Sequence, residues 1–174
     1  RVLDATAGVT LVERDGGKDP HIWLDPARAK IVVSALAARL AQITPGVKAT
    51  FDANAAAYNR ELDALGGEYD AGLSECARRD FVTAHAAFGY LADRYGLQQI
   101  SISGSSPEAE PSARRLEQVA QQVREHRATT VFVEPLVSAR VAETVARETG
   151  TTTATLNPIE GLTEDELATG ADYV

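Results

Sequence analysis

Several residue types that would mark common protein classes are scarce in this 174-residue sequence. Methionine is absent, and Cys76 and Trp23 are the only cysteine and tryptophan. A single cysteine excludes an internal disulfide and any zinc site built from paired cysteines. No hydrophobic run approaches the length of a membrane span. The chain begins at Arg1 without a methionine, and we therefore expect it to be a processed or trimmed piece of a longer protein.

Basic residues are also in the minority. Lysine and arginine together number 17 against 25 aspartates and glutamates, which gives a net charge of −8. This balance argues against nucleic acid, which requires clustered cations, and is compatible with a cationic ligand. The length suits one domain or two small lobes, and a hydrophobic content of 44% is ordinary for a globular protein.

Catalytic motifs are missing as well. The sequence contains no GxGxxG or Walker A loop, no GxSxG nucleophile elbow and no HExxH zinc motif. No nucleophile is paired with a base in the sequence.

The most distinctive stretch is DPHIWLDP at 19–26. Its prolines fix the backbone and remove donors, so the segment is stiff and cannot lie inside a helix. Asp25 and Pro26 predict a helix start, as N-cap and first helical residue. His21 is thus expected on a short rigid segment just ahead of a helix, where binding a metal would cost it little entropy.

The first half of the chain is expected to be mainly helical. Residues 1–12 predict a short strand or two, and 13–18 a polar loop. Apolar residues at helical spacing predict a helix over 26–43 and a second, unusually long one over 45–75. A helix of that length favours a spine between two lobes over a member of a compact bundle.

The second half alternates strands with helices. Short strands are expected at 80–84, 97–103, 129–133 and 151–156, joined by short loops and helices. This order predicts an α/β fold with a four-stranded parallel sheet and helices on both faces. The helices between and after the strands are expected at 86–95, from Ser112, at 138–149, and from a capping box of Thr163 and Glu166.

Polar residues follow three of these strands at their carboxyl ends, where parallel sheets bind ligands. His85 follows the first strand, Glu134 the third, and Asn157 and Glu160 the fourth. With His21 they provide two imidazoles and one or two carboxylates, which suits zinc or manganese. Glu134 and Glu160 fit solvated loops equally well, and Asn157 is either a loop hydrogen-bond partner or a weak carbonyl ligand.

The third histidine, His126, follows the helix from Ser112 and is expected to cap its carboxyl end rather than bind metal.

Five motifs together resemble those of one protein family. DPHIWLDP at 19–26, TAHAAFGYLADRYGL at 83–97, SPEAEPSARRL at 106–116, FVEP at 132–135 and LNPIEGLT at 156–163 occur in this order. They resemble the zinc/manganese solute-binding proteins of bacterial ABC importers, a family of lipoproteins and periplasmic binding proteins that includes cell-adhesion members.

The resemblance implies two lobes joined by a long helix, with metal held in the cleft between them. Residues 1–44 are then the tail of the N-terminal lobe, 45–75 the interdomain helix and 76–174 the C-terminal α/β lobe.

The resemblance also implies a ligand set. His21 matches the family's second histidine ligand and His85 its third, while the first would lie upstream of Arg1. Many relatives carry an aspartate where this chain has Asn157, and Glu160 is expected to supply the carboxylate instead, with Asn157 as an alternative ligand. Glu134 matches a structural residue or one that supports a ligand. Manganese members tend to carry a glutamate at the position of His85, which favours zinc.

The function implied is extracytoplasmic capture of Zn²⁺ and its delivery to an ABC permease, at the cell surface or in the periplasm, with a lipid anchor in the full-length protein. The resemblance thus implies capture rather than catalysis, and the protein is not expected to be an enzyme. The alternatives are a manganese-type binding protein and a zinc-dependent hydrolase with Glu134 as its base. A truncated N-terminal lobe would expose apolar surface, which invites a non-native dimer. The residues concerned are Val2, Leu3, Ile31 and Leu36.

Overall fold

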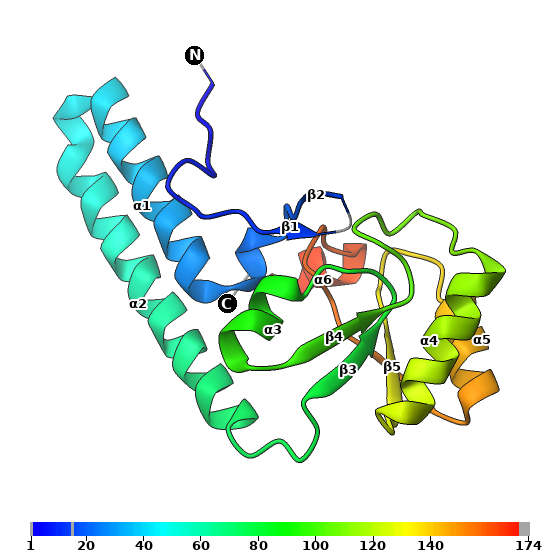
Figure 1. Ribbon diagram of the computed structural model, residues 1–174. Coiled ribbons are helices and arrows are strands. Elements are labelled where there is room, and N and C mark those ends of the chain that lie inside the picture. Colours follow the sequence, from blue (N-terminus) through cyan, green and yellow to red (C-terminus); the bar gives the residue numbers. More distant parts are fainter. Residues whose placement is uncertain (1, 15, 171–174) are drawn as a thin grey trace.

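The computed structural model describes residues 2–14 and 16–170. A hairpin of two long helices, α1 and α2, lies beside a unit of alternating strands and helices, as Figure 1 shows. The N-terminal elements are β1 (Glu13–Arg14), β2 (Gly17–Lys18), the 3-10 helix η1 (Ile22–Leu24), α1 (Pro26–Ile43), the 3-10 helix η2 (Pro45–Val47) and α2 (Lys48–Leu73). The remaining elements are β3 (Asp80–Thr83), α3 (Gly89–Tyr95), β4 (Gln98–Ser101), α4 (Ala113–Glu125), β5 (Thr130–Val133), α5 (Arg140–Thr149), β6 (Thr152–Thr155) and α6 (Glu164–Thr169).

The expected four-stranded parallel sheet is confirmed. Its strand order is β4-β3-β5-β6, and every neighbouring pair runs parallel. After β3 the chain forms β4 on one side of it, and then crosses to form β5 on the other side. Because the connections between parallel strands are right-handed, α3 lies on one face of the sheet and α4 and α5 lie on the other (Figure 1). The direction of winding reverses between β3 and β5. In parallel sheets a crevice opens at that point, beyond the carboxyl ends of the two strands.

The main hydrophobic core lies between the sheet and the α4 and α5 face. Val82 of β3 and Val131 of β5 are completely buried there, beneath Val119 of α4 and Val145 of α5. Burying each such side chain contributes about 1.5–3 kcal/mol. This core fixes β3 and β5 against each other, so the loops that follow them start from a rigid base.

The long helix is shorter than the expected 45–75. Residues Pro45–Val47 form a separate 3-10 turn, and α2 runs for 26 residues from Lys48 to Leu73. At 1.5 Å per residue α2 is about 39 Å long. It packs along α1 and buries only Leu62 completely, so most of its surface faces solvent. Gly66 and Gly67 lie within it without ending it.

The strands expected in residues 1–12 are absent from the described residues 2–12, and that prediction was wrong. Among the described residues, the pairing nearby is the two-residue β1–β2 ladder, within the segment expected to be a loop. Val9 and Ile22 instead pack against Tyr90, and the Val12 N–H donates to the Tyr90 hydroxyl over 2.9 Å. Side-chain anchoring thus replaces strand pairing in this segment.

Two helices begin later than expected. The helix predicted from Ala86 begins at Gly89, and the one predicted from Ser138 begins at Arg140. Ala86 donates its N–H to the Gly104 carbonyl over 3.0 Å, which uses the donor outside a helix. The expected helix starts at Asp25–Pro26 and Ser112 and the capping box of Thr163 and Glu166 are confirmed.

The expected apolar surface at the N-terminal part is largely present. Val2 is 99% exposed, Ile31 40% and Leu36 47%, whereas Leu3 is half-buried. Ile31 and Leu36 both belong to α1.

Asp25 links α1 to α3, and its removal is expected to destabilise the fold. The buried carboxylate caps α1 by accepting from the Ala27 N–H, and it pairs with Arg28 and with Arg94, whose Nη2 lies 3.0 Å from Oδ2. We expect Asp25→Ala to lower the free energy of unfolding by about 2–3 kcal/mol. This is less than the ~3–5 kcal/mol of a fully buried pair, because both arginines reach solvent.

Urea unfolding measures the effect, and Asp63→Ala is the matched control. Asp63 also pairs across elements, with Lys30, but its side chain is 63% exposed. Its removal should change stability by no more than about 0.5 kcal/mol. Equal effects of the two substitutions would contradict the structural role assigned to Asp25.

Candidate metal centre

His21 lies where the stiff DPHIWLDP segment enters the fold. It is the residue before η1, and the Ile22 N–H donates to the Pro20 carbonyl over 2.8 Å. The side chain is 2% exposed, and the Trp23 ring packs beside it with centroids 5.4 Å apart. The rigid placement expected from the two prolines is therefore present, because the backbone on both sides of His21 is fixed.

Asp19 orients the His21 ring. Its Oδ1 lies 2.7 Å from His21 Nδ1 and also accepts the His21 backbone N–H over 3.0 Å. A carboxylate oxygen only accepts, so Nδ1 donates and the lone pair is left on Nε2, on the other edge of the ring. Sequence reasoning missed this role for Asp19. The signal was an aspartate two residues before a histidine, the spacing at which its side chain reaches backbone N–H groups.

His85 is held in the same way by Glu134. His85 follows β3 and Glu134 follows β5, so the two lie where the winding of the sheet reverses. Glu134 Oε1 lies 2.7 Å from His85 Nδ1 and accepts the His85 N–H over 3.2 Å. This geometry assigns Glu134 to the Nδ1 edge of the ring. A carboxylate there fixes the ring and raises its basicity as a ligand.

The free edges of both rings converge on Glu160. Glu160 Oε1 lies 3.2 Å from His21 Nε2 and 3.3 Å from His85 Nε2, and the ring centroids are 5.3 Å apart. Donors held about 2.0 Å from zinc at tetrahedral angles are about 3.3 Å apart. The donor atoms of all three residues lie within 4.8 Å of one another. Completely buried His85 Nε2 has no hydrogen-bond partner among the described residues, an arrangement that suits a metal.

Glu160 reaches the histidines from the loop after β6, which is shaped by Asn157. The Asn157 Oδ1 accepts the Ile159 N–H over 2.8 Å, and its Nδ2 donates to Glu166 over 3.1 Å. Ile159 adopts a φ of 56°, and Trp23 Nε1 donates to the Pro158 carbonyl over 2.8 Å. Asn157 is therefore used within the loop, whereas Glu160 points at the histidines with its side chain 30% exposed.

The charges around His85 alter its protonation. Burial lowers the pKa of His85, but the hydrogen bond to Glu134 and the negative charges of Glu134 and Glu160 together outweigh it. The net effect raises the pKa above 6.5, the ordinary value for histidine. A metal ion at Nε2 must therefore compete with a proton.

A cavity of about 210 Å³ adjoins the centre. Glu108, Glu134, Asn157 and Glu160 contribute to its wall. A larger hollow of about 540 Å³ between α1 and α2 is lined by Ala, Ser, Gln, Lys, Asp and Asn side chains and contains no histidine. The acidic wall of the smaller cavity favours the approach of a cation.

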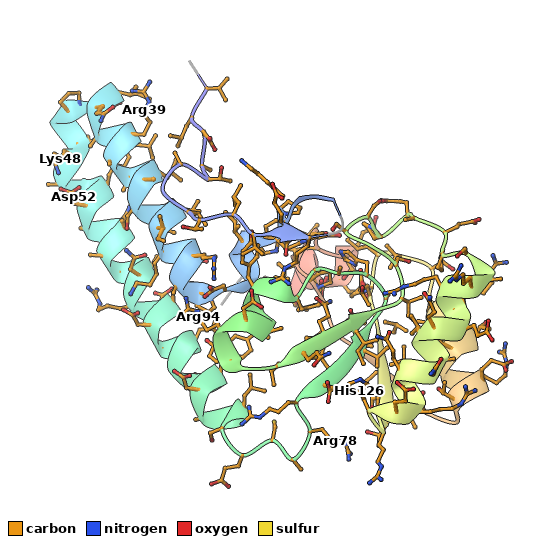
Figure 2. The ribbon with its side chains drawn as sticks, viewed as in Figure 1. Arg39, Lys48, Asp52, Arg78, Arg94 and His126 are labelled. Atoms are coloured by element: carbon orange, nitrogen blue, oxygen red, sulfur yellow. The ribbon has the colours of Figure 1, made fainter. Side chains whose placement is uncertain are left out.

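His126 lies apart from the centre, as expected. It caps the carboxyl end of α4, and its Nδ1 lies 3.1 Å from Oδ1 of Asp80, the first residue of β3. This puts His126 at the amino ends of the strands, opposite the edge where His85 lies (Figure 2).

Comparisons with known proteins point to one family. Residues 1–174 match the family described as "ZnuA: Zinc-uptake complex component A periplasmic". The chain is 44% identical over 155 residues to the zinc-binding protein AdcA of Streptococcus pyogenes serotype M1, with 89% of this chain and 30% of AdcA covered. It is 36% identical over 156 residues to the high-affinity zinc uptake system protein ZnuA of Bacillus subtilis, covering 90% of this chain and 49% of that protein.

Solved structures of similar proteins point to the same family. The laminin-binding protein Lbp of Streptococcus pyogenes has a TM-score of 0.89 at 37% identity, covering 94% of this chain and 64% of Lbp. The Zn(II)-bound ZnuA-like domain of Streptococcus pneumoniae AdcA has a TM-score of 0.82 at 42% identity, covering 98% of this chain and 64% of that one. The chain thus spans less than two thirds of the length of these relatives.

Metal binding at His85 is expected to weaken as the pH falls through the raised pKa of its imidazole, because proton and metal compete for Nε2. Below that pKa the affinity for Zn²⁺ should fall about tenfold per pH unit. Fluorescence of Trp23, which lies beside His21, reports the titration. The stability of the metal-free fold depends on pH in the opposite direction. The stability gained from protonating His85 is complete below about pH 6.5 and is lost as the pH rises through the raised pKa.

Glu134→Gln tests whether Glu134 sets the pKa of His85, and His126→Gln is the control. Glu134→Gln removes the Glu134 charge, one of the causes that raise the pKa of His85, so the pH midpoint of metal binding should move to lower pH. His126→Gln should leave the midpoint unchanged, because this residue lies at the other end of the sheet. The same midpoint in Glu134→Gln and in the unaltered chain would show that Glu134 does not control the protonation of His85.

Proposed function

The chain belongs to the ZnuA family of periplasmic zinc-uptake components, and from this premise we propose that it captures Zn²⁺ outside the cytoplasm and delivers it to an ABC permease. His21, His85 and Glu160 are the proposed ligands. The observation that carries the proposal is the convergence of two buried Nε2 atoms on one carboxylate oxygen, at 3.2 and 3.3 Å.

Zinc fits this donor set better than manganese. Imidazole nitrogens suit zinc, whereas manganese favours carboxylate, carbonyl and water oxygens. Both histidines are held by carboxylates in the tautomer that leaves Nε2 free. Histidine ligands of protein-bound zinc usually donate their other ring N–H to a carboxylate, a backbone carbonyl or water in this way. The relatives named AdcA and ZnuA are zinc-binding and zinc-uptake proteins by name, and this supports the same cargo.

Capture is supported over catalysis. The competing hydrolase would require a free general base beside a metal-bound water. Glu134 is the strongest candidate base, but its Oε1 is engaged by both the backbone N–H and Nδ1 of His85. Glu160, the other acidic residue at the centre, is assigned to the metal. Both acidic residues of the centre thus already have another role, which favours capture.

Delivery requires that the metal can leave again. The two histidines are buried, but Glu160 itself is exposed, in the loop after β6 and next to the acidic cavity. Movement of that loop alone removes one donor and opens the centre. A Streptococcus pneumoniae relative is named a zinc-binding lipoprotein, which supports a lipid-anchored, extracytoplasmic location. Among the described residues no helix is long and apolar enough to cross a membrane.

Self-association of this chain is a further part of the proposal. Ile31 and Leu36 are exposed on α1, and a second copy would cover them. A monomer mass at every protein concentration in sedimentation equilibrium would exclude it.

Ligand substitutions test the proposed function. We expect His21→Ala and His85→Ala each to weaken Zn²⁺ binding in isothermal titration calorimetry on the order of a hundredfold or more. That exceeds the roughly 10–100-fold typical of residues that only orient a ligand. Glu160→Gln should also weaken it, and His126→Ala is the matched control, because that histidine lies at the far end of the sheet.

Two outcomes would contradict the proposal. Unchanged zinc affinity in both histidine variants would remove the assigned centre. Zinc-dependent turnover of ester or phosphate substrates, lost in the same variants, would favour the hydrolase. Titration with Mn²⁺ tests the cargo, and we expect weaker binding than with Zn²⁺.

A further inference from the structure

Arg14 of β1 is linked to the metal centre through Asp19. We propose that Arg14 is a positioning residue for metal capture, which fixes the Asp19 carboxylate and thereby the tautomer and orientation of His21. Its effect on the His21 ring rests on geometry alone, whereas its effect on zinc affinity rests on the proposed function.

The contact that carries this inference is between Arg14 and the second oxygen of Asp19. Arg14 Nε lies 3.2 Å from Asp19 Oδ2, while Oδ1 of the same carboxylate accepts from both the backbone and Nδ1 of His21. The Asp19 side chain is 0% exposed. A buried carboxylate requires a paired cation, and Arg14 is the cation that reaches it among the described residues. This contact is an ion pair and not a hydrogen bond, since neither Arg14 Nε nor Asp19 Oδ2 has a hydrogen-bond partner among the described residues. Its charge attraction acts on Oδ2 and so favours the orientation in which Oδ1 faces the His21 ring.

Helix α3 holds Arg14 in this position. Arg14 Nη2 donates to the Gly89 carbonyl over 3.3 Å and to Asp93 Oδ2 over 2.5 Å. The approach is possible because residue 89 lacks a side chain: a Cβ there would lie 2.5 Å from Arg14 Nε and 2.8 Å from Cζ. The buried Tyr90 hydroxyl donates to the Asp19 carbonyl over 2.9 Å. Consecutive residues of α3, Gly89 and Tyr90, thus contact both the arginine that pairs with the Asp19 side chain and the Asp19 backbone.

His85 offers an internal comparison. Glu134 bonds its Nδ1 at 2.7 Å, as Asp19 bonds His21, but among the described residues no arginine or lysine forms an ion pair with Glu134. Removal of Arg14 should therefore disturb His21 and leave His85 unchanged. A purely structural role, in which Arg14 only attaches the β1–β2 ladder to α3, would disturb neither ring selectively.

Arg14→Met tests the inference, because it keeps the length of the side chain and removes its charge and donors. In the metal-free chain at about pH 8, ¹⁵N shifts of the imidazoles should show His21 changing from the Nδ1–H tautomer to a mixture of tautomers, with His85 unaltered. Zinc affinity should fall about tenfold or more, within the ~10–100-fold range of residues that orient a ligand. Arg14→Lys, which restores the charge, should recover part of both effects.

Two further variants keep the test decisive if Arg14→Met does not fold. Gly89→Ala displaces the guanidinium without changing any charge, and it should shift the His21 tautomer in the same direction. Arg28→Met is the matched control. Arg28 also lies against the Tyr90 ring, at 4.5 Å, but its ion pair is with Asp25. In this variant Asp25 would still be paired with Arg94. This control should leave the His21 shifts and zinc affinity unchanged.

The outcomes distinguish the two hypotheses. An unaltered His21 tautomer in Arg14→Met and Gly89→Ala, in a chain that binds zinc, overturns the positioning role and leaves the proposed function intact. A chain that binds no zinc, but whose His21 tautomer changes in these variants, overturns the proposed function and supports the positioning role.

Discussion

Two hydrogen bonds between a carboxylate and an imidazole organise this protein, one from Asp19 to His21 and one from Glu134 to His85, each 2.7 Å long. Both rings are almost completely buried, and a buried imidazole requires a partner for its N–H. Each carboxylate supplies that partner at Nδ1 and leaves the Nε2 lone pair free. The unpartnered Nε2 of His85 is the consequence, and the proposed ligand role follows from it.

Helix α3 brings the two halves of the centre together, although it is only seven residues long. The turn before it carries His85, and its first residues anchor the segment that carries His21, through Tyr90 and the close contact between Gly89 and Arg14. Because this anchoring uses side chains, residues 2–12 require no strand partner. The Tyr90 hydroxyl links the two ends of the anchored segment, since it accepts from Val12 and donates to Asp19.

The third proposed ligand differs physically from the other two. His21 and His85 are buried, whereas Glu160 is exposed, in a loop shaped by Asn157 and the left-handed Ile159. Rigid imidazoles lose little entropy on binding, which favours affinity, while a carboxylate on a loop can swing away, which favours release. A protein that captures an ion and then delivers it requires both properties.

The sequence by itself determined the α/β class, the parallel sheet, three of the six helix starts and the residues of the candidate centre. These depend on local patterns: strand and helix periodicity, Asp-Pro and Ser caps, and the rule that the carboxyl ends of parallel strands meet. It did not determine that residues 2–12 lack strands, that α3 begins at Gly89, or that Asp19 and Arg14 support His21. Those features depend on contacts between residues distant in the chain, such as Arg14 with Gly89 and Asp93. Only the tertiary structure decided them, because no local pattern records which side chain will lie across from another.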